Sequence, residues 1–505
     1  MSKSQLCQTV TATTMGELIA GRDAAAEADL VELRLDGVQN PDAAGALADR
    51  RRPVLITCRP AWEGGRFDGS EEERLRLLSS ALAEGAEYVD IEFRAGEPFR
   101  ALAAREPGRV LVSAHDFAGV PDDLAGLARA MRRTGTRRIK VAVMAHRLTD
   151  VLPLREIGRG GDAVVVAMGN AGVVTRLLPG RFGSLWSYGG QAAAPGQIPA
   201  ARMVQTFRFR DVGPTTRLFG VVSPFALHSF SPVMHNAAFA AVGLDAVYLP
   251  FAAADFADFL AFADALDVEG VSITIPYKLE ALAAAASADA RTRAVGAANT
   301  LRRMRRREDG AASGVAQSAS AQPVGWEATN TDIDGFLAPL RDAYGAPLPG
   351  ARASVLGAGG AARAVIAALK DEGAVVSVHA RRAAQAAEVA QVMGVTTGPW
   401  PPAPGAWDLL VNSTPLGGAT ARDVSPLPSG PFTGRLVYDL TYGSGTSRLL
   451  ADAAAAGCRT LDGLPMLVAQ AERQFEWWTG VPSPRGVMRA ALGQQPLHPQ
   501  GGAET

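Results

Sequence analysis

The sequence RRIKVAVM, residues 137–144, is a β-branched and aliphatic run that places Lys140 where a buried strand normally carries another apolar residue. An amine in a water-poor site is driven towards its neutral form, because desolvation disfavours the charge. A neutral amine can attack a ketone and form a Schiff base. The alternative is a strand-edge lysine whose stem lies along the protein while its amine reaches water.

Strand-like and helix-like segments alternate on both sides of this run. We expect eight strands in the first 200 residues, over 6–11, 31–36, 54–59, 88–93, 110–114, 138–144, 163–167 and 184–188. Segments of helical period lie between most of them, for example 71–84 and 121–134. This alternation predicts an α/β fold that begins with a (β/α)8 TIM barrel, in which catalytic residues lie at the carboxyl ends of strands.

Polar residues follow that rule along the predicted barrel. Glu32 and Arg34 share one face of the second strand, Arg59 ends the third, and His115 follows the fifth. Taken singly, each has an ordinary explanation, such as a solvated arginine or a satisfied core histidine. Together with Lys140 they place an amine, an imidazole, a carboxylate and guanidinium groups around one barrel mouth, which favours the Schiff-base interpretation.

The order and spacing of these motifs resemble the type I 3-dehydroquinate dehydratases from residue 5 to about 200. The matching segments are Glu32-Leu33-Arg34-Leu35-Asp36, Thr57-Cys58-Arg59, Glu63-Gly64-Gly65, Ser113-Ala114-His115-Asp116-Phe117, Ile139-Lys140-Val141-Ala142, Met168-Gly169, Gly172, Thr175-Arg176, Phe182-Gly183-Ser184 and Ala194-Pro195-Gly196-Gln197. The resemblance implies that Lys140 forms a covalent Schiff base with the substrate ketone, that His115 moves the neighbouring proton, and that Glu63 orients His115.

The same resemblance implies a set of substrate-binding residues in the barrel. These are Glu32, Arg34, Arg59, Arg176 and Gln197, with Arg176 holding the substrate carboxylate in a bidentate grip. The family usually has serine where this chain has Ala193. A hydrogen bond lost there would weaken substrate binding by roughly 1 kcal/mol.

The second half of the chain restarts with a strand over 217–222 and a prolyl turn that carries Ser229 and Ser231. Ser231 could be a plain helix cap followed by Pro232 at the first helical position, which leaves Ser229 without a role. Farther on, the segments Val271-Ser272-Ile273-Thr274-Ile275-Pro276-Tyr277-Lys278, Ala297-Ala298-Asn299-Thr300-Leu301 and Thr329-Asn330-Thr331-Asp332 complete a resemblance to the substrate domain of shikimate dehydrogenases.

This second resemblance implies that Lys278 and Asp332 form the proton-transfer pair, with the lysine charged beside the carboxylate. An ordinary surface ion pair is the alternative. The implied substrate-binding residues are Ser229, Ser231, Thr274, Asn299, Tyr442 and Gln470. The chain departs from the family at Ser272, where asparagine is usual, and at Phe230, where lysine is common.

The segment Ala353-Ser354-Val355-Leu356-Gly357-Ala358-Gly359-Gly360-Ala361-Ala362 joins a strand to a helix through a glycine turn. This context is the dinucleotide fingerprint, in which backbone N–H groups approach a pyrophosphate. Arg381 and Arg382 stand where an NAD enzyme carries a carboxylate, and they suit a 2′-phosphate, so NADP(H) is favoured. The expected cofactor-binding residues are Gly357, Ala358, Gly359, Gly360, Ala361, Arg381, Arg382, Asn412, Thr414 and Gly463. Ala380 replaces the asparagine usual in the family.

Composition excludes several classes of protein. With 50 basic and 51 acidic residues, the chain has no charge excess that would suit nucleic acid or an anionic membrane. The three cysteines Cys7, Cys58 and Cys458 lack metal-ligand spacing, so we expect buried thiols and no metal. No apolar run approaches the ~20 residues of a membrane helix. A strand begins almost at the N-terminus, so a cytoplasmic location without a leader is expected.

The two resemblances together imply a bifunctional shikimate-pathway enzyme that converts 3-dehydroquinate to 3-dehydroshikimate and then to shikimate. A monomer or homodimer is expected. We expect a barrel over 1–205, a linker over 206–215, a substrate domain over 216–346, a Rossmann domain over 347–462, returning helices over 463–493 and a disordered tail over 494–505. Arginine-rich, low-complexity sequence over 302–328 predicts a flexible insertion rather than a phosphate-binding patch. Two alternatives stay open, an NAD-linked quinate/shikimate dehydrogenase and a barrel that only binds or regulates.

Overall fold

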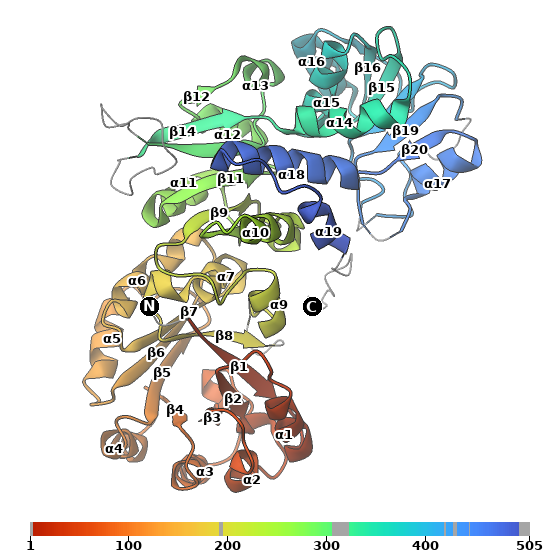
Figure 1. Cartoon of the computed structure of the whole chain (residues 1–505). Coiled ribbons are helices and arrows are strands. Elements are labelled where there is room, and N and C mark those ends of the chain that lie inside the picture. The colour runs from red at the N-terminus through yellow and green to blue at the C-terminus, as the bar shows by residue number, and fades with distance from the viewer. Residues whose placement is uncertain are drawn as a thin grey trace. The chain divides into compact units, whose positions relative to one another are not determined.

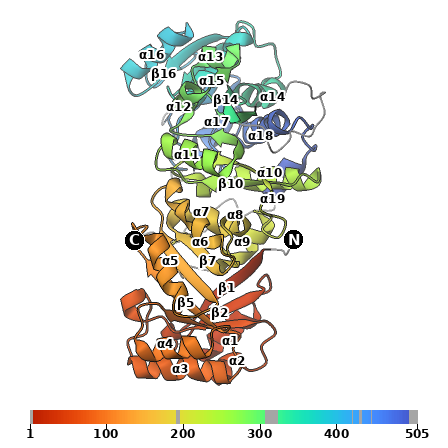
Figure 2. The same cartoon turned by 90° about the vertical axis from the view of Figure 1, so that its left-hand side faces the viewer.

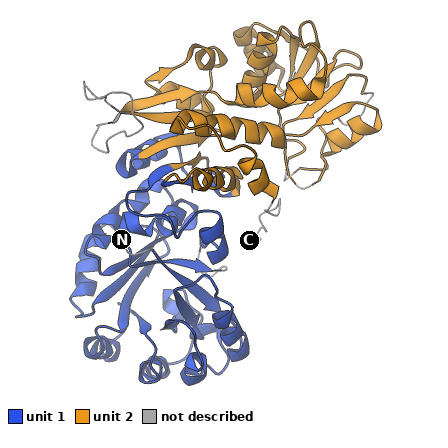
Figure 3. Cartoon of the chain, in the orientation of Figure 1, with its two compact units in different colours: residues 1–218, 224–227, 245–267 blue, residues 219–223, 228–244, 268–505 orange. Residues whose placement is uncertain are grey.

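The structure is a computed structural model that describes residues 4–190, 195–305, 323–418, 421–427, 432–443 and 445–493 (Figure 1). Ala193, most of the predicted insertion and the predicted tail lie outside these residues. The chain divides into two compact units (Figure 3). The first comprises 1–218, 224–227 and 245–267, and the second comprises 219–223, 228–244 and 268–505. The predicted domain boundaries stay predictions.

Eight parallel strands form the centre of the first unit, which confirms the predicted barrel. They are β1 (Gln5–Thr11), β2 (Leu30–Arg34), β3 (Val54–Thr57), β4 (Tyr88–Glu92), β5 (Val110–Asp116), β6 (Arg138–Met144), β7 (Ala163–Met168) and β8 (Trp186–Gly190). Their order is β7-β6-β5-β4-β3-β2-β1-β8, and the Leu185 amide donates to the Ala163 carbonyl where the two end strands meet. Aliphatic and aromatic side chains such as Cys7, Leu55, Leu111 and Trp186 fill the interior.

Helices cover the outside of these strands (Figure 2). They are α1 (Met15–Asp23), α2 (Ala43–Leu47), α3 (Glu71–Ala83), α4 (Glu97–Arg105), α5 (Leu124–Arg132), α6 (Pro153–Gly158), α7 (Gly169–Leu177), α8 (Pro179–Phe182) and α9 (Ala200–Gln205). Local sequence sets their starts. Ser70 and Glu73 form a capping box at α3, so two orphan amides of the first turn are satisfied. The predicted second strand ends early, because Leu35–Gly37 form a 3-10 turn.

A segment from beyond residue 240 completes the first unit. It contains β10 (Ala246–Phe251) and α11 (Phe256–Leu266). Asp258 on α11 is buried and accepts hydrogen bonds from the amides of Leu148 and Thr149 and from the Thr149 hydroxyl, at 2.8, 3.0 and 2.8 Å. Leu148 and Thr149 belong to a short turn that follows β6. The strand that carries Lys140 is thus anchored to a carboxylate that lies 110 residues later in the sequence.

The second unit contributes most of a mixed six-stranded sheet of order β10-β9-β11-β13-β14-β12. The strands not yet named are β9 (Arg217–Val222), β11 (Val268–Ile273), β12 (Ser287–Ala288), β13 (Thr300–Arg305) and β14 (Pro323–Thr329), with helices α10 (Ser231–Ala241), α12 (Lys278–Ala284) and α13 (Ala290–Val295). The described ends of the predicted insertion, residues 302–305 and 323–328, belong to β13 and β14. β13 and β14 pair antiparallel, and Arg302 forms an ion pair with Glu327 at 2.5 Å.

A third sheet follows the doubly wound pattern. Its six parallel strands are β15 (Arg352–Leu356), β16 (Val375–His379), β17 (Thr396–Thr397), β18 (Leu409–Asn412), β19 (Leu436–Asp439) and β20 (Arg459–Leu461). The order β17-β16-β15-β18-β19-β20 reverses direction between β15 and β18, and such a switch point is where dinucleotides bind. The helices are α14 (Asp332–Tyr344), α15 (Gly360–Asp371), α16 (Ala383–Met393), α17 (Arg448–Ala455), α18 (Leu464–Thr479) and α19 (Val487–Gly493).

Candidate active sites

A cavity opens inside the barrel and brings together every residue predicted for the first site. Its lining contains Glu32, Arg34, Arg59, Glu63, His115, Lys140, Arg176 and Gln197. Other lining residues were not predicted to have a role: Thr9, Gly64, Phe117, Ala142, Val166, Met168 and Tyr188. The predicted residues come from distant parts of the chain, so the barrel topology alone gathers them.

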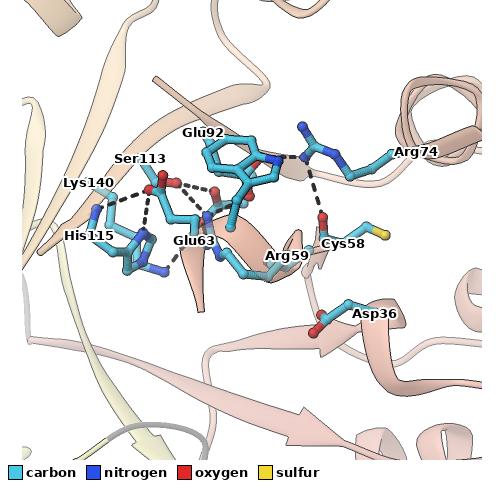
Figure 4. Close-up of polar contacts among 12 residues, drawn as sticks. Asp36, Cys58, Arg59, Glu63, Arg74, Glu92, Ser113, His115 and Lys140 are labelled. Atoms are coloured by element: carbon cyan, nitrogen blue, oxygen red, sulfur yellow. Dashed lines mark hydrogen bonds and ion pairs between the residues drawn. The ribbon is translucent and has the colours of Figure 1, made fainter. Parts of the chain in front are cut away.

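Lys140 lies in the middle of β6 with its amine directed into this cavity (Figure 4). The amine is 3.3 Å from Asp90 Oδ2 and 3.8 Å from Glu32 Oε1, and it lies 4.5 Å from the centre of the Tyr188 ring. Carboxylates face the buried amine, because β2 and β4 each direct an acidic side chain into the barrel.

A buried ion network on β4 was missed by the sequence interpretation. Arg59 Nη2 lies 2.9 Å from Asp90 Oδ2, and Arg59 Nη1 lies 2.7 Å from Glu92 Oε1. The Ser113 hydroxyl donates to Asp90 Oδ1 at 2.5 Å and accepts from Arg59 Nη1 at 2.8 Å. Arg74 pairs with Glu92 from outside the ring of strands. The sequence does contain an indication of this network. Asp90 and Glu92 alternate with Val89 and Ile91, so the two acidic residues share one face of the strand.

His115 and Glu63 form the second element of the site (Figure 4). Glu63 Oε1 lies 3.1 Å from His115 Nδ1 and accepts from the His115 backbone amide at the same distance. Burial, together with the charges of Arg59 and Lys140, holds the pKa of His115 well below its usual value. Burial raises the pKa of Glu63 to about 7. A neutral imidazole whose orientation is fixed by a carboxyl group is the state that a general base requires.

Arg176 on α7 lines the cavity, and no ion pair to its side chain is found among the described residues. Its side chain is buried, and its Nε atom has no hydrogen-bond partner among the described residues. Burial lowers the pKa of its guanidinium to about 10. A buried, unsatisfied guanidinium costs stability unless an anion occupies the space beside it. The barrel is therefore built to receive a carboxylate or a similar anion.

The second set of predicted residues meets around Lys278, at the start of α12. Lys278 Nζ lies 2.6 Å from Asp332 Oδ2, and Asn299 Nδ2 donates to Asp332 Oδ1 at 2.8 Å. Gly335 lies one turn after Asp332, and a Cβ atom there would stand 2.7 Å from the Gln470 Cβ. This close approach of α14 and α18 brings Gln470 towards the same pair. With both side chains largely buried, Lys278 and Asp332 are not an ordinary surface ion pair.

The serine turn before α10 differs from the simple cap considered above. Ser231 is the first residue of α10 and makes no side-chain cap, while the Ser229 hydroxyl accepts from the Ser231 amide at 3.1 Å. The Phe230 ring lies 5.9 Å from the Tyr442 ring, and burial and the Asp332 charge raise the pKa of Tyr442. These contacts connect the serine turn with the Lys278–Asp332 pair. Thr274 lies in the turn just before Lys278, where its carbonyl accepts from the Tyr277 amide at 3.0 Å.

The glycine turn between β15 and α15 lies against the same lysine. Gly357 has φ +112°, which permits the turn, and a Cβ atom on Gly360 would stand 3.1 Å from Lys278 Cδ. Around the Cβ position of Gly359, no described atom lies within 4 Å, so Gly359 leaves open space at the helix N-terminus. Arg381 and Arg382 follow β16 directly and are exposed. They lie beside the glycine turn, because the Gly357 amide donates to the carbonyl of His379 at the end of β16. These features fit a dinucleotide with an added phosphate.

Other predicted cofactor residues hold the walls of this space. Asn412 is fully buried, donates to Asp439 Oδ1 at 2.9 Å and accepts from the Thr414 hydroxyl at 2.7 Å. Gly463 has no room for a side chain, because a Cβ atom would lie 2.2 Å from the Leu440 carbonyl oxygen. Asn412 therefore shapes the loop through internal hydrogen bonds. Among the described residues, no group of acidic, histidine or cysteine side chains could hold a metal ion, and no helix could span a membrane.

Comparison with known proteins agrees with this arrangement. Residues 6–214 match the type I 3-dehydroquinase family, residues 222–301 match the shikimate dehydrogenase substrate binding domain, and residues 463–492 match the shikimate 5′-dehydrogenase C-terminal domain. The bifunctional 3-dehydroquinate dehydratase/shikimate dehydrogenase of Arabidopsis thaliana chloroplasts is 31% identical over 518 residues, which cover 95% of this chain and 83% of that protein. The chain belongs to the bifunctional 3-dehydroquinate dehydratase/shikimate dehydrogenase family.

Single-function relatives match each half of this bifunctional chain. A shikimate dehydrogenase (NADP(+)) of Microcystis aeruginosa is 34% identical, covering 55% of this chain and 97% of that protein. A 3-dehydroquinate dehydratase of Desulfotalea psychrophila is 30% identical, covering 40% of this chain and 96% of that protein. Each half therefore corresponds to a nearly complete relative.

Proposed function

We propose that this chain dehydrates 3-dehydroquinate in its barrel through an imine on Lys140 and then reduces 3-dehydroshikimate to shikimate with NADPH. The observation that carries the proposal is the barrel cavity, where the amine of Lys140, the neutral imidazole of His115 and the unsatisfied guanidinium of Arg176 face one space. Membership of the bifunctional family supports both steps.

In the barrel, Arg176 would bind the substrate carboxylate and so fix the ketone beside Lys140. Once its ammonium has released one proton, the amine attacks the ketone. Loss of water with return of that proton gives a protonated imine, which makes the adjacent carbon acidic. His115 takes that proton and returns one to the departing hydroxyl, while Glu63 holds the ring in place through Nδ1. Glu32, Arg34, Arg59 and Gln197 are proposed to contact the substrate hydroxyls.

In the second site, Ser229 and Ser231 would bind the substrate carboxylate, while Thr274, Asn299, Tyr442 and Gln470 face its hydroxyls. Lys278 donates the proton that the reduced ketone oxygen needs, and Asp332 holds the ammonium in position at 2.6 Å. The chemistry expected of the cofactor, when bound, is hydride delivery to that ketone carbon. The turn Gly357–Ala361 would bind the pyrophosphate of this cofactor, and Gly463, Asn412 and Thr414 shape the space beside it.

Arg381 and Arg382 support a preference for NADP(H), because exposed guanidinium groups can bind a 2′-phosphate. The test is a titration of the purified full chain with NADPH and NADH at fixed 3-dehydroshikimate. We expect the KM for NADPH to be lower than the KM for NADH by ~10-fold or more, and we expect Arg381→Ser to make this difference smaller. An equal or better response to NADH would contradict the assignment and favour the NAD-linked alternative.

The dehydration step is tested by treating the chain with 3-dehydroquinate and borohydride and measuring peptide masses. We expect a reduced adduct on Lys140 and none in Lys140→Ala. Absence of an adduct from the wild-type chain would contradict the imine and favour a barrel that only binds or regulates. A cytoplasmic location, a monomeric or homodimeric state and the absence of nucleic-acid partners stay predictions.

A further inference from the structure

Imine formation leaves the charge of the lysine nitrogen unchanged. A C–N bond forms, the C=O bond breaks, and two of the three ammonium protons leave with the oxygen as water, so an ammonium and a ketone give a protonated imine. The nitrogen therefore carries one positive charge before the ketone reacts and again once the imine has formed. A buried charge is costly unless an opposite charge lies next to it. The barrel must supply that partner before and after the substrate binds.

We propose that Asp90 is this partner: it pairs with the ammonium of Lys140 in the free enzyme and with the protonated imine once the substrate is attached. This role rests on the proposed imine at Lys140. Asp90 contacts the reacting nitrogen, so it is a catalytic residue, and Arg59 and Ser113 are positioning residues that act through it. In this role the Asp90 carboxylate contacts Lys140, Arg59 and Ser113 and does not accept a proton in the net reaction.

Distances and partners favour Asp90 over Glu32. Asp90 Oδ2 lies 3.3 Å from Lys140 Nζ, while the nearest Glu32 oxygen lies 3.8 Å away. Both Glu32 oxygens already accept hydroxyl hydrogen bonds, from Thr9 at 2.8 Å and from Thr57 at 2.7 Å. Asp90 is completely buried, and apart from Lys140 its oxygens contact the Arg59 guanidinium and the Ser113 hydroxyl.

Strand register makes this geometry rigid. Ser113 pairs with Glu92 on β4 and with Lys140 on β6, so the three residues lie in line across neighbouring strands. Asp90 precedes Glu92 by two positions and therefore points to the same inner face. A carboxylate on a strand moves less than one on a loop, so its distance to the lysine nitrogen can persist while the bonds at that nitrogen change.

The surrounding charges keep Asp90 ionised. Burial alone raises the pKa of Asp90, but Arg59 and then Lys140 oppose this effect and hold the pKa below its usual value. The titratable and charged groups of the cavity and of the ion network beside it come from several elements: Cys7, Glu32, Arg34, Arg59, Glu63, Asp90, Glu92, His115, Arg176 and Tyr188. Of these, Asp90 and Glu32 are the acidic groups within 4 Å of Lys140 Nζ among the described residues.

The test compares the rate and pH dependence of imine trapping in four full-length proteins: wild type, Asp90→Asn, Ser113→Ala and Asp162→Asn. Asp162 is the matched control, since it pairs with Arg132 at 2.6 Å on the same barrel but away from the cavity. Each protein is mixed with 3-dehydroquinate and cyanoborohydride between pH 5 and 9, and the adduct on Lys140 is quantified by mass. Dehydration and the reduction of added 3-dehydroshikimate are assayed in parallel.

We expect Asp90→Asn to slow trapping and dehydration by ~100-fold and to move the pH profile of trapping to lower pH by about one pH unit, because both positively charged forms of the nitrogen lose their partner. Ser113→Ala keeps the charge and should move the profile in the same direction by less. Asp162→Asn should match the wild type. A purely structural effect would lower the amplitude without moving the profile.

Three outcomes separate the possibilities. If Asp90→Asn is trapped at the wild-type rate with the wild-type pH profile, the counter-ion role is wrong. If Asp90→Asn does not fold, judged by thermal unfolding and by lost reduction of 3-dehydroshikimate, Ser113→Ala decides, and an unmoved profile in that variant overturns the proposal. If the wild type itself gives no adduct, the imine fails, and the role of Asp90 fails with it.

Discussion

Lys140 and Lys278 are both lysines beside carboxylates, yet their surroundings differ. Lys140 faces two carboxylates at 3.3 and 3.8 Å, and the nearer one is shared with Arg59. Lys278 has a single carboxylate at 2.6 Å, which Asn299 holds in place. The amine of Lys140 therefore lies farther from its nearest carboxylate, Asp90, which also pairs with Arg59. The amine of Lys278 lies close to Asp332, which forms an ion pair with that lysine alone among the described residues.

This difference fits the two chemistries proposed for these lysines, a nucleophile in the barrel and a proton donor in the second site. A nucleophile must release its proton and form a new bond at nitrogen, so a short exclusive ion pair would oppose its reaction. A proton donor needs to stay charged and oriented until the transition state, which a short exclusive pair favours. The distance and the sharing of the carboxylate therefore distinguish the roles more clearly than the residue type does.

The largest effect should come from removing the nucleophile. Lys140→Ala is expected to reduce flux from 3-dehydroquinate by at least ~10³-fold, because no other described lysine amine lies in the cavity. Reduction of added 3-dehydroshikimate should be unchanged. NADPH consumption from each substrate measures both. Loss of both activities would mean that the variant is damaged rather than chemically impaired.

Removing the proton donor should have the next largest effect. Lys278→Ala is expected to lower kcat for 3-dehydroshikimate reduction by ~10²- to 10³-fold. Dehydration in the barrel, followed by the ultraviolet absorbance of the enone product, should stay at the wild-type rate. A dehydratase defect of similar size would contradict the separation of the two lysines into two sites.

The residues proposed to bind the substrate carboxylate also differ between the two sites, and removing them should have a smaller effect. Arg176→Gln removes a buried charged donor and should raise KM for 3-dehydroquinate by ~10²-fold, equivalent to ~3 kcal/mol. Ser229→Ala removes one neutral hydroxyl and should raise KM for 3-dehydroshikimate by only ~5-fold, equivalent to ~1 kcal/mol. Steady-state kinetics on each substrate measure both values. Equal effects would show that the barrel does not depend on a free guanidinium.

The smallest effect concerns pH. Burial raises the pKa of Glu63 to about 7, so this group is protonated below that pH and loses the charge that orients His115. We expect kcat/KM for dehydration to fall as the pH drops through about 7, while reduction of 3-dehydroshikimate shows no such limb. The low pKa of His115 keeps its imidazole neutral over the same range. Glu63→Gln should abolish this fall in kcat/KM at low pH. If the fall persists in that variant, another group causes it.

Much of this architecture could be predicted from the sequence. The strand around Lys140 was predicted with its observed bounds, because β-branched residues fill the run and a turn residue precedes it. All eight residues predicted for the barrel line one cavity, since the ends of parallel strands converge. The glycine turn was equally clear, because Gly357 must adopt a positive φ angle.

The buried ion network of the barrel could not be predicted, because its members are far apart in the sequence. The role of Arg59 as a substrate ligand stays a prediction, but its ion pairs with Asp90 and Glu92, which lie more than thirty positions later, were not predicted. Ser113 was noted only as part of a motif, although its hydroxyl connects Arg59 with Asp90. Local pattern indicates which face of a strand is buried. Which charges meet there depends on the register of neighbouring strands.

Asp258 has a consequence for how this polypeptide can be shortened. Its carboxylate accepts the amides of Leu148 and Thr149, and α11 lies beyond the region that resembles a free-standing dehydratase. A gene fragment that stops at residue 214 would encode the complete barrel and yet leave those amides without their acceptor. The compact unit that holds the barrel therefore includes residues 245–267, which lie within the segment matching the substrate binding domain. An expression clone intended to yield the dehydratase alone should extend through residue 267, where the first compact unit ends.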